Sequence, residues 1–164
     1  MLGPVLGQSL EFLGIRREDR RDTFVGFFTL VAILAAHSML ETARDALFLD
    51  KLPASRLPLA YIAIAGVALL VSKLNQALTA RFDRRKLLSL SLLIGGAVTA
   101  GFWVATAAPS PMMLGALYVW TGVLATVVVV QFWLQLGDVL TITQAKRVFA
   151  IIGTGGLIGA TLGS

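Results

Sequence analysis

The stretch Pro111–Leu136, PMMLGALYVWTGVLATVVVVQFWLQL, contains no Asp, Glu, Lys or Arg and is dominated by aliphatic and aromatic side chains. A helix of roughly 20 such residues spans the hydrocarbon core of a bilayer. A soluble amphipathic helix would instead carry a charged or polar face along its whole length. The stretch therefore predicts a membrane-spanning helix.

Four further apolar runs share this character. The chain of 164 residues is 57% hydrophobic and 14% charged, with a mean hydropathy of +0.82. This composition excludes a soluble, secreted, disordered or fibrous protein. We expect an all-α, polytopic membrane protein with about five transmembrane helices, spanning about residues 24–49, 59–80, 87–107, 111–136 and 148–164.

Residues 1–22 are expected to form a cytosolic or interfacial segment before a transmembrane bundle over residues 23–164. Within the first fifteen residues, apolar side chains recur at roughly helical spacing, which predicts a short amphipathic helix or, alternatively, a frayed terminus. The charge run Arg16–Asp22 follows this segment, whereas a secretory signal carries its positive charge first. The chain also ends at Ser164 directly after an apolar run, so we expect a truncated end.

The basic residues predict the orientation of the chain, because cytoplasmic links are enriched in Lys and Arg. The N-terminal segment and the second and fourth links hold most of the fourteen, whereas the opposite links hold Arg44, Lys51 and Arg56. We therefore expect a cytoplasmic N-terminus in a bacterial inner (plasma) membrane. The cytoplasmic set is Arg16, Arg17, Arg20, Arg21, Arg81, Arg84, Arg85, Lys86, Lys146 and Arg147.

Composition also restricts the chemistry. The chain has no cysteine and one histidine, so it cannot build a thiolate metal site, and the histidine alone builds neither a zinc site nor a conventional catalytic triad. The basic clusters lie between apolar runs, where they face lipid headgroups rather than nucleic acid. We expect no enzyme activity, no metal, no cofactor and no nucleic acid partner.

Charges inside a span are candidates for function, because they are costly to insert. His37, Glu41, Arg44 and Asp45 form one stripe on the first helix, at i, i+4, i+7 and i+8. Arg44 and Glu41 either neutralise each other, or the stripe lines a cavity. Lys73 lies about eight residues before Arg81, roughly 12 Å of helix rise from the cytosolic border. An ammonium there suits an anionic ligand or a carboxylate partner.

Gly155, Gly159 and Gly163 repeat every fourth residue in the last run. Small residues at this spacing allow helix backbones to approach closely. We expect this face to pack against another helix, either of this chain or of a missing portion.

Several motifs support a family resemblance. The loop Asp83–Lys86 resembles the charged loop of major facilitator transporters, although the usual glycines are absent. More specific are Glu41–Leu47 (ETARDAL) with the Pro53–Pro58 turn, and Gln144–Phe149 (QAKRVF) leading into the glycine-rich helix. Together these motifs resemble the ATP/ADP translocase (nucleotide transporter) branch of major facilitator-like proteins, over about residues 23–164.

The resemblance implies the first five of twelve helices, hence an incomplete N-terminal half of a major facilitator-type bundle that alternates access around a central site. Arg44 stands where those carriers tend to have a basic residue, often lysine, before an acidic one. Arginine binds phosphate bidentately whereas lysine acts as a point charge, so this change bears on nucleotide specificity. From the intramembrane charges and the resemblance together, we expect the substrate-binding residues to be Arg44, Lys73, Glu41, Asp45 and His37. We expect the cytosolic gating residues to be Asp83, Arg84, Arg85, Lys86, Lys146 and Arg147.

The leading hypothesis is therefore membrane transport by the N-terminal part of a secondary carrier or antiporter for an organic anion, with ATP/ADP exchange as one form of it. Its partners would be membrane lipids, the anionic substrate, and the remaining carrier helices or an oligomer partner. The alternative is a non-transporting membrane module that binds partner helices as an anchor, assembly or regulatory subunit.

Overall fold

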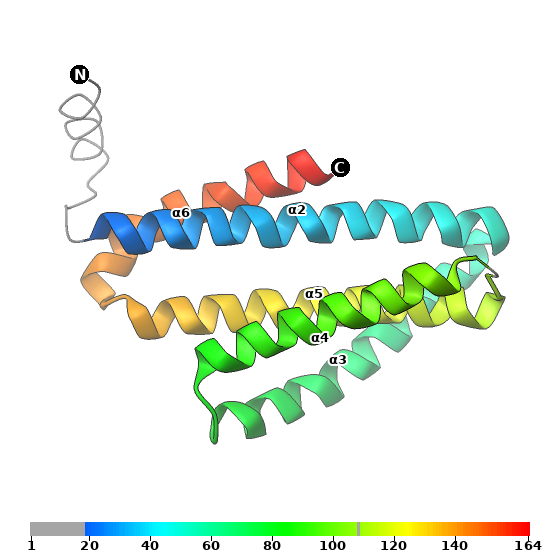
Figure 1. Cartoon of the computed structure of the whole chain (residues 1–164), viewed down its shortest axis with the longest axis horizontal. Coiled ribbons are helices and arrows are strands. Elements are labelled where there is room, and N and C mark those ends of the chain that lie inside the picture. Colours follow the sequence, from blue (N-terminus) through cyan, green and yellow to red (C-terminus); the bar gives the residue numbers. More distant parts are fainter. Residues whose placement is uncertain (1–18, 108) are drawn as a thin grey trace. The chain divides into compact units, whose positions relative to one another are not determined.

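The computed structural model describes residues 19–107 and 109–164, which form five long helices joined by short turns (Figure 1). The helices are α2 (Arg20–Lys51), α3 (Leu57–Thr79), α4 (Arg84–Ala105), α5 (Pro111–Val139) and α6 (Ile142–Gly163), with a short 3-10 turn, η2 (Ala54–Arg56), before α3. Each long helix, α3 taken together with η2, is long and apolar enough to cross a membrane. The expectation of an all-α membrane protein with five spanning helices is confirmed. The predicted surface helix at the N-terminus lies outside the described residues.

The described residues belong to two compact units. One contains the chain up to Ala36 together with Leu136–Ser164, and the other contains His37–Gln135. The boundary falls inside α2 and inside α5, so each of these helices contributes to both units.

The helix ends follow from local turn chemistry. Pro58 lies in the first turn of α3, where its missing N–H costs no hydrogen bond. Asp83 caps α4 by accepting a hydrogen bond from the backbone N–H of Arg85 at 2.8 Å. Ser110 accepts from the N–H of Met113 at the start of α5, and Thr141 forms a capping box with Gln144 at the start of α6.

These caps make two links shorter than the sequence suggested. The link expected over residues 81–86 is helical from Arg84 onward. The polar link expected over residues 137–147 is almost entirely helical, because α5 continues to Val139 and α6 begins at Ile142. Capping satisfies the first backbone N–H groups of α6, so its polar first turns extend the last span towards its N-terminus.

The second unit packs around apolar side chains from three helices. Phe48 of α2, Leu52 directly after that helix, Ala60 of α3, and Leu114 and Tyr118 of α5 form its buried cluster. Helix α4 approaches α5 closely at Gly95, where an added Cβ would lie 2.6 Å from the Leu124 side chain. This unit therefore positions the C-terminal half of α2 against α5.

In the first unit the glycine face of α6 lies against α2. A Cβ added at Gly155 would lie 2.8 Å from the carbonyl oxygen of Phe27, and one added at Gly159 would collide with the carbonyl of Val31. Gly163 is also buried. The glycines thus allow α6 to reach the backbone of α2, an approach that any larger side chain would prevent.

Substitution of these glycines tests the packing. We expect Gly159→Ala to destabilise the protein by about 1–3 kcal/mol, because the new methyl group meets backbone atoms that cannot move aside. Gly153→Ala is the matched control, since a Cβ there meets nothing within 4 Å. The control is expected to be neutral or to stabilise by about 0.5–1 kcal/mol, as alanine favours a helix over glycine. Unfolding in detergent, followed by circular dichroism, measures both; equal effects would contradict the packing.

Candidate functional site

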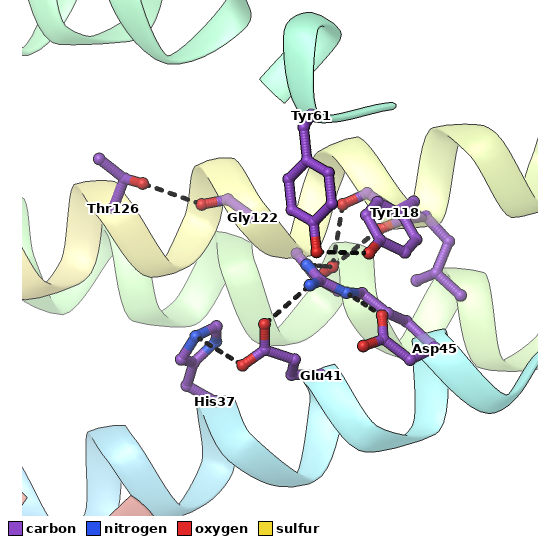
Figure 2. A network of polar contacts seen from close by, with 10 residues as sticks. His37, Glu41, Asp45, Tyr61, Tyr118, Gly122 and Thr126 are labelled. Carbon is purple, nitrogen blue, oxygen red and sulfur yellow. Dashed lines mark hydrogen bonds and ion pairs between the residues drawn. The ribbon is translucent and has the colours of Figure 1, made fainter. Parts of the chain in front are cut away.

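Arg44 is a buried charge on α2, and its side chain is only 3% exposed. One terminal nitrogen donates to Glu41 Oε1 at 2.9 Å, and Nε donates to Asp45 Oδ1 at 3.1 Å. The other terminal nitrogen donates to the Thr121 hydroxyl of α5 at 3.2 Å. Each nitrogen of the guanidinium therefore has a hydrogen-bond partner, two carboxylates and one hydroxyl, and Figure 2 shows the contacts at Glu41 and Asp45.

Spacing on α2 explains why these groups meet. Residues three apart on a helix share a face, so Glu41 lies beside Arg44, and Asp45 follows as its chain neighbour. Thr121 belongs to α5, and its hydroxyl also contacts the carbonyl oxygens of Leu117 and Tyr118 in the same helix. The contact between Arg44 and Thr121 thus joins α2 to α5.

An aromatic ring covers the face of the guanidinium. The central carbon of Arg44 lies 4.1 Å from the centroid of the Tyr118 ring, the geometry of a cation–π interaction. Tyr118 packs on Phe48 with centroids 4.9 Å apart, and its hydroxyl donates to the Tyr61 oxygen of α3 at 3.2 Å. Figure 2 shows the hydroxyl groups of Tyr61 and Tyr118 meeting above this site. The Tyr118 ring therefore covers the flat face of the Arg44 guanidinium, and the hydrogen bonds hold its edges.

His37 extends this group by one helical turn. Its Nε2 lies 3.6 Å from Glu41 Oε2. Glu41 and Asp45 are 47% and 41% exposed, while Arg44 is buried behind them. We call His37, Glu41, Arg44, Asp45, Tyr118 and Thr121 the Arg44 network. When His37 is neutral, the two carboxylates and the one guanidinium of the Arg44 network leave one net negative charge.

Lys73, the other predicted intramembrane cation, is exposed on α3. Within residues 19–107 and 109–164, no carboxylate pairs with it, and it takes part in none of the ion pairs of the Arg44 network. Nearby Asn75 is buried, and its Oδ1 accepts from Gln131 Nε2 of α5 at 2.7 Å. The structure therefore separates Lys73 from the Arg44 network and joins α3 to α5 through amides.

The predicted gating residues fall into two groups. Asp83 caps α4, with Arg84, Arg85 and Lys86 in the first turn of that helix. In the first unit, Arg147 donates to Asp19 Oδ2 at 2.8 Å, and Gln144 donates to Asp19 Oδ1 at 2.7 Å. Lys146 lies beside them on α6. Arg147 is thus bonded to a buried carboxylate.

Sequence analysis missed Asp19, Tyr61, Tyr118 and Thr121. Asp19 is fully buried, although it belongs to a charge run that looks solvated in the sequence. The two tyrosines and the threonine stand in apolar runs, where they are indistinguishable from packing residues. Tyr118 and Thr121 are three apart and so share a face of α5, but only the packed structure turns that face to Arg44.

Removing both counter-charges tests the Arg44 network. We expect Glu41→Gln with Asp45→Asn to destabilise the protein by about 3–5 kcal/mol, because it leaves a buried, uncompensated guanidinium. Asp50→Asn is the control, since the Asp50–Lys51 ion pair is exposed on both sides and is worth at most about 1 kcal/mol. Thermal unfolding in detergent compares them, and a double variant no less stable than the control would disprove the burial of Arg44.

The contacts of Asp19 predict a second difference in stability between two variants. Asp19→Asn weakens the pairing with Arg147, a partly buried partner, and we expect a loss of about 2 kcal/mol or more. Asp22→Asn, in the first turn of α2 and three residues after Asp19, is the control and removes only a helix-dipole interaction of about 0.3–1 kcal/mol. The same unfolding measurement applies. Indistinguishable losses in the two variants would show that the Asp19 contacts contribute no stability of their own.

Comparison of the chain with protein-family models, with curated proteins and with solved structures finds no match.

Proposed function

We propose that this chain is part of a secondary carrier that moves an organic anion across a membrane by alternating access, with nucleotides such as ATP and ADP as candidate substrates. The observation that carries the proposal is Arg44, a guanidinium 3% exposed on a membrane-spanning helix and held by two carboxylates. Intramembrane charges are costly and mark solute or ion pathways more often than they contribute to stability.

The arrangement of the Arg44 network suits exchange of partners. Glu41 and Asp45 are about half exposed, so they are accessible from outside the network, while the guanidinium behind them is not. A phosphate or carboxylate of a substrate accepts charge-assisted hydrogen bonds from a guanidinium, as these two side chains do. Such an anion would replace Glu41 or Asp45 at Arg44, and the released carboxylate would take up water or a proton.

The ring of Tyr118 supports this role for Arg44. The ring contacts the face of the guanidinium, whereas the carboxylates contact its edges. Exchange at the edges therefore leaves the cation–π contact in place, so the guanidinium keeps its orientation while its hydrogen-bond partner changes.

The competing hypothesis was a module that binds partner helices. One observation in its favour was the glycine face of α6, because the sequence alone allowed this face to contact a helix from elsewhere. Gly155 and Gly159 instead contact α2 of the same chain. The glycine face of α6 is therefore a packing surface within this chain.

Transport by the purified protein tests the proposal. The protein encoded by the complete reading frame is reconstituted in liposomes, and uptake of labelled ATP, ADP and inorganic phosphate is measured. We expect uptake of at least one anion, reduced at least about tenfold by Arg44→Met and by a smaller factor by Arg44→Lys, which keeps the charge but loses the fork.

Arg56→Met is the control, because Arg56 lies in η2 outside the long helices and is exposed. Lys73→Ala is measured alongside as a second cation in a span, and a loss of uptake would place it on the substrate path. Circular dichroism of each variant separates lost transport from lost folding. Absence of uptake for all three anions, or uptake equally affected by Arg44→Met and Arg56→Met, would reject the anion carrier with Arg44 in its path.

A further inference from the structure

Glu41 is shared between Arg44 and His37 on α2. Its Oε1 accepts from a terminal nitrogen of Arg44 at 2.9 Å, and its Oε2 lies 3.6 Å from His37 Nε2. Asp45, the other carboxylate of the Arg44 network, contacts Arg44 Nε at 3.1 Å. Figure 2 shows His37 beside Glu41, on the side away from Asp45. Glu41 is therefore the carboxylate that keeps an ionisable neighbour when it leaves Arg44.

The ionisable groups around His37 and Glu41 come from three helices. They are Arg44 and Asp45 of α2, Tyr118 of α5 and Tyr61 of α3. In the described part of the chain, α4 from Leu87 onward and α6 from Val148 onward carry no ionisable side chain. Arginine and tyrosine keep their charge state near neutral pH, whereas histidine is the side chain that ordinarily changes its charge there.

The charge of the Arg44 network depends on the protonation of His37. With neutral His37 the network carries one net negative charge, and a proton on His37 brings the sum to zero. An anion bound at Arg44 adds at least one further negative charge, and uncompensated charge inside a span is costly. A bound anion therefore favours protonation, and by linkage the proton strengthens binding of the anion by the same factor.

Resting on the carrier function proposed above, we propose that His37 and Glu41 take up one proton for each anion that binds Arg44, so that anion and proton cross the membrane in the same direction. The anion takes the terminal nitrogen of Arg44 from Glu41 Oε1. The released carboxylate then pairs with protonated His37, one helical turn away and already beside Oε2. The proton comes from water on the side where the anion enters, is held between His37 Nε2 and Glu41 Oε2, and leaves with the anion on the other side.

Uptake by liposomes that contain the protein encoded by the complete reading frame tests this coupling. Labelled ATP, ADP and inorganic phosphate are supplied between about pH 6 and pH 8, the range in which histidine changes its charge. We expect the half-saturating concentration of the transported anion to rise about fivefold or more over this range, since one coupled proton allows at most about tenfold per pH unit. A pH-sensitive dye inside the liposomes measures the protons that enter.

Two substitutions of His37 have opposite expected effects. His37→Gln is neutral at every pH, so we expect weak anion binding, loss of the pH dependence and one proton fewer per anion. His37→Lys is charged throughout the range, so we expect tight binding that is equally independent of pH. Ser38→Ala changes the next residue of α2, which is polar but not ionisable, and should keep the dependence of the unmodified protein. Protons carried by the anion itself are common to all variants.

The outcomes separate the coupling from the carrier. Uptake by the unmodified protein with the same pH dependence as His37→Gln would overturn the coupling and leave the carrier standing. Equally weakened binding in both His37 variants would assign His37 a structural role and overturn the coupling too. Where a variant does not transport, binding of the labelled anion to the protein in detergent gives the same comparison. Absence of uptake of all three anions by the unmodified protein would reject the carrier, and the coupling with it.

Discussion

The guanidinium of Arg44 is a permanent charge inside an apolar helix, and the second unit is arranged to neutralise it. A charge in this position is costly unless it is both paired and fully hydrogen-bonded. Glu41 and Asp45 supply the pairing from the same helix, and Thr121 and Tyr118 supply the remaining contacts from α5. Because Tyr118 also contacts Phe48 and Tyr61, this one charge restricts how α2, α3 and α5 are placed against each other. Loss of any partner therefore disturbs packing as well as charge.

The first unit associates its helices in a different way. Lipid tails are as apolar as leucine, so helices in a membrane associate through close packing and hydrogen bonds rather than through the hydrophobic effect. Gly155 and Gly159 bring α6 onto the backbone of α2, and Asp19 binds Gln144 and Arg147 near the ends of these helices. The glycine contacts thus hold α6 against the backbone of α2, and the ion pair between Arg147 and Asp19 adds a second contact where α2 begins.

Polar groups in the second unit serve two separate purposes. The Arg44 network has an accessible acidic rim and a buried cation, a combination in which partners can be exchanged without exposing the cation to lipid. The hydrogen bond from the Gln131 amide to the Asn75 amide oxygen instead joins α3 to α5.

The sequence by itself determined the five spans and the polar stripe on α2, because hydrophobic runs and helical spacing are local properties of the chain. It also identified the glycine face of α6, but not the surface that this face contacts. Only the tertiary structure selected Tyr118 and Thr121 as partners of Arg44, since an aromatic ring or hydroxyl in an apolar run has no distinguishing pattern until the helices pack. It likewise buried Asp19 and left Lys73 exposed, the reverse of what their surroundings in the sequence suggest. The physical reason is that burial depends on which faces of different helices meet, and that is a non-local property which helical periodicity does not encode.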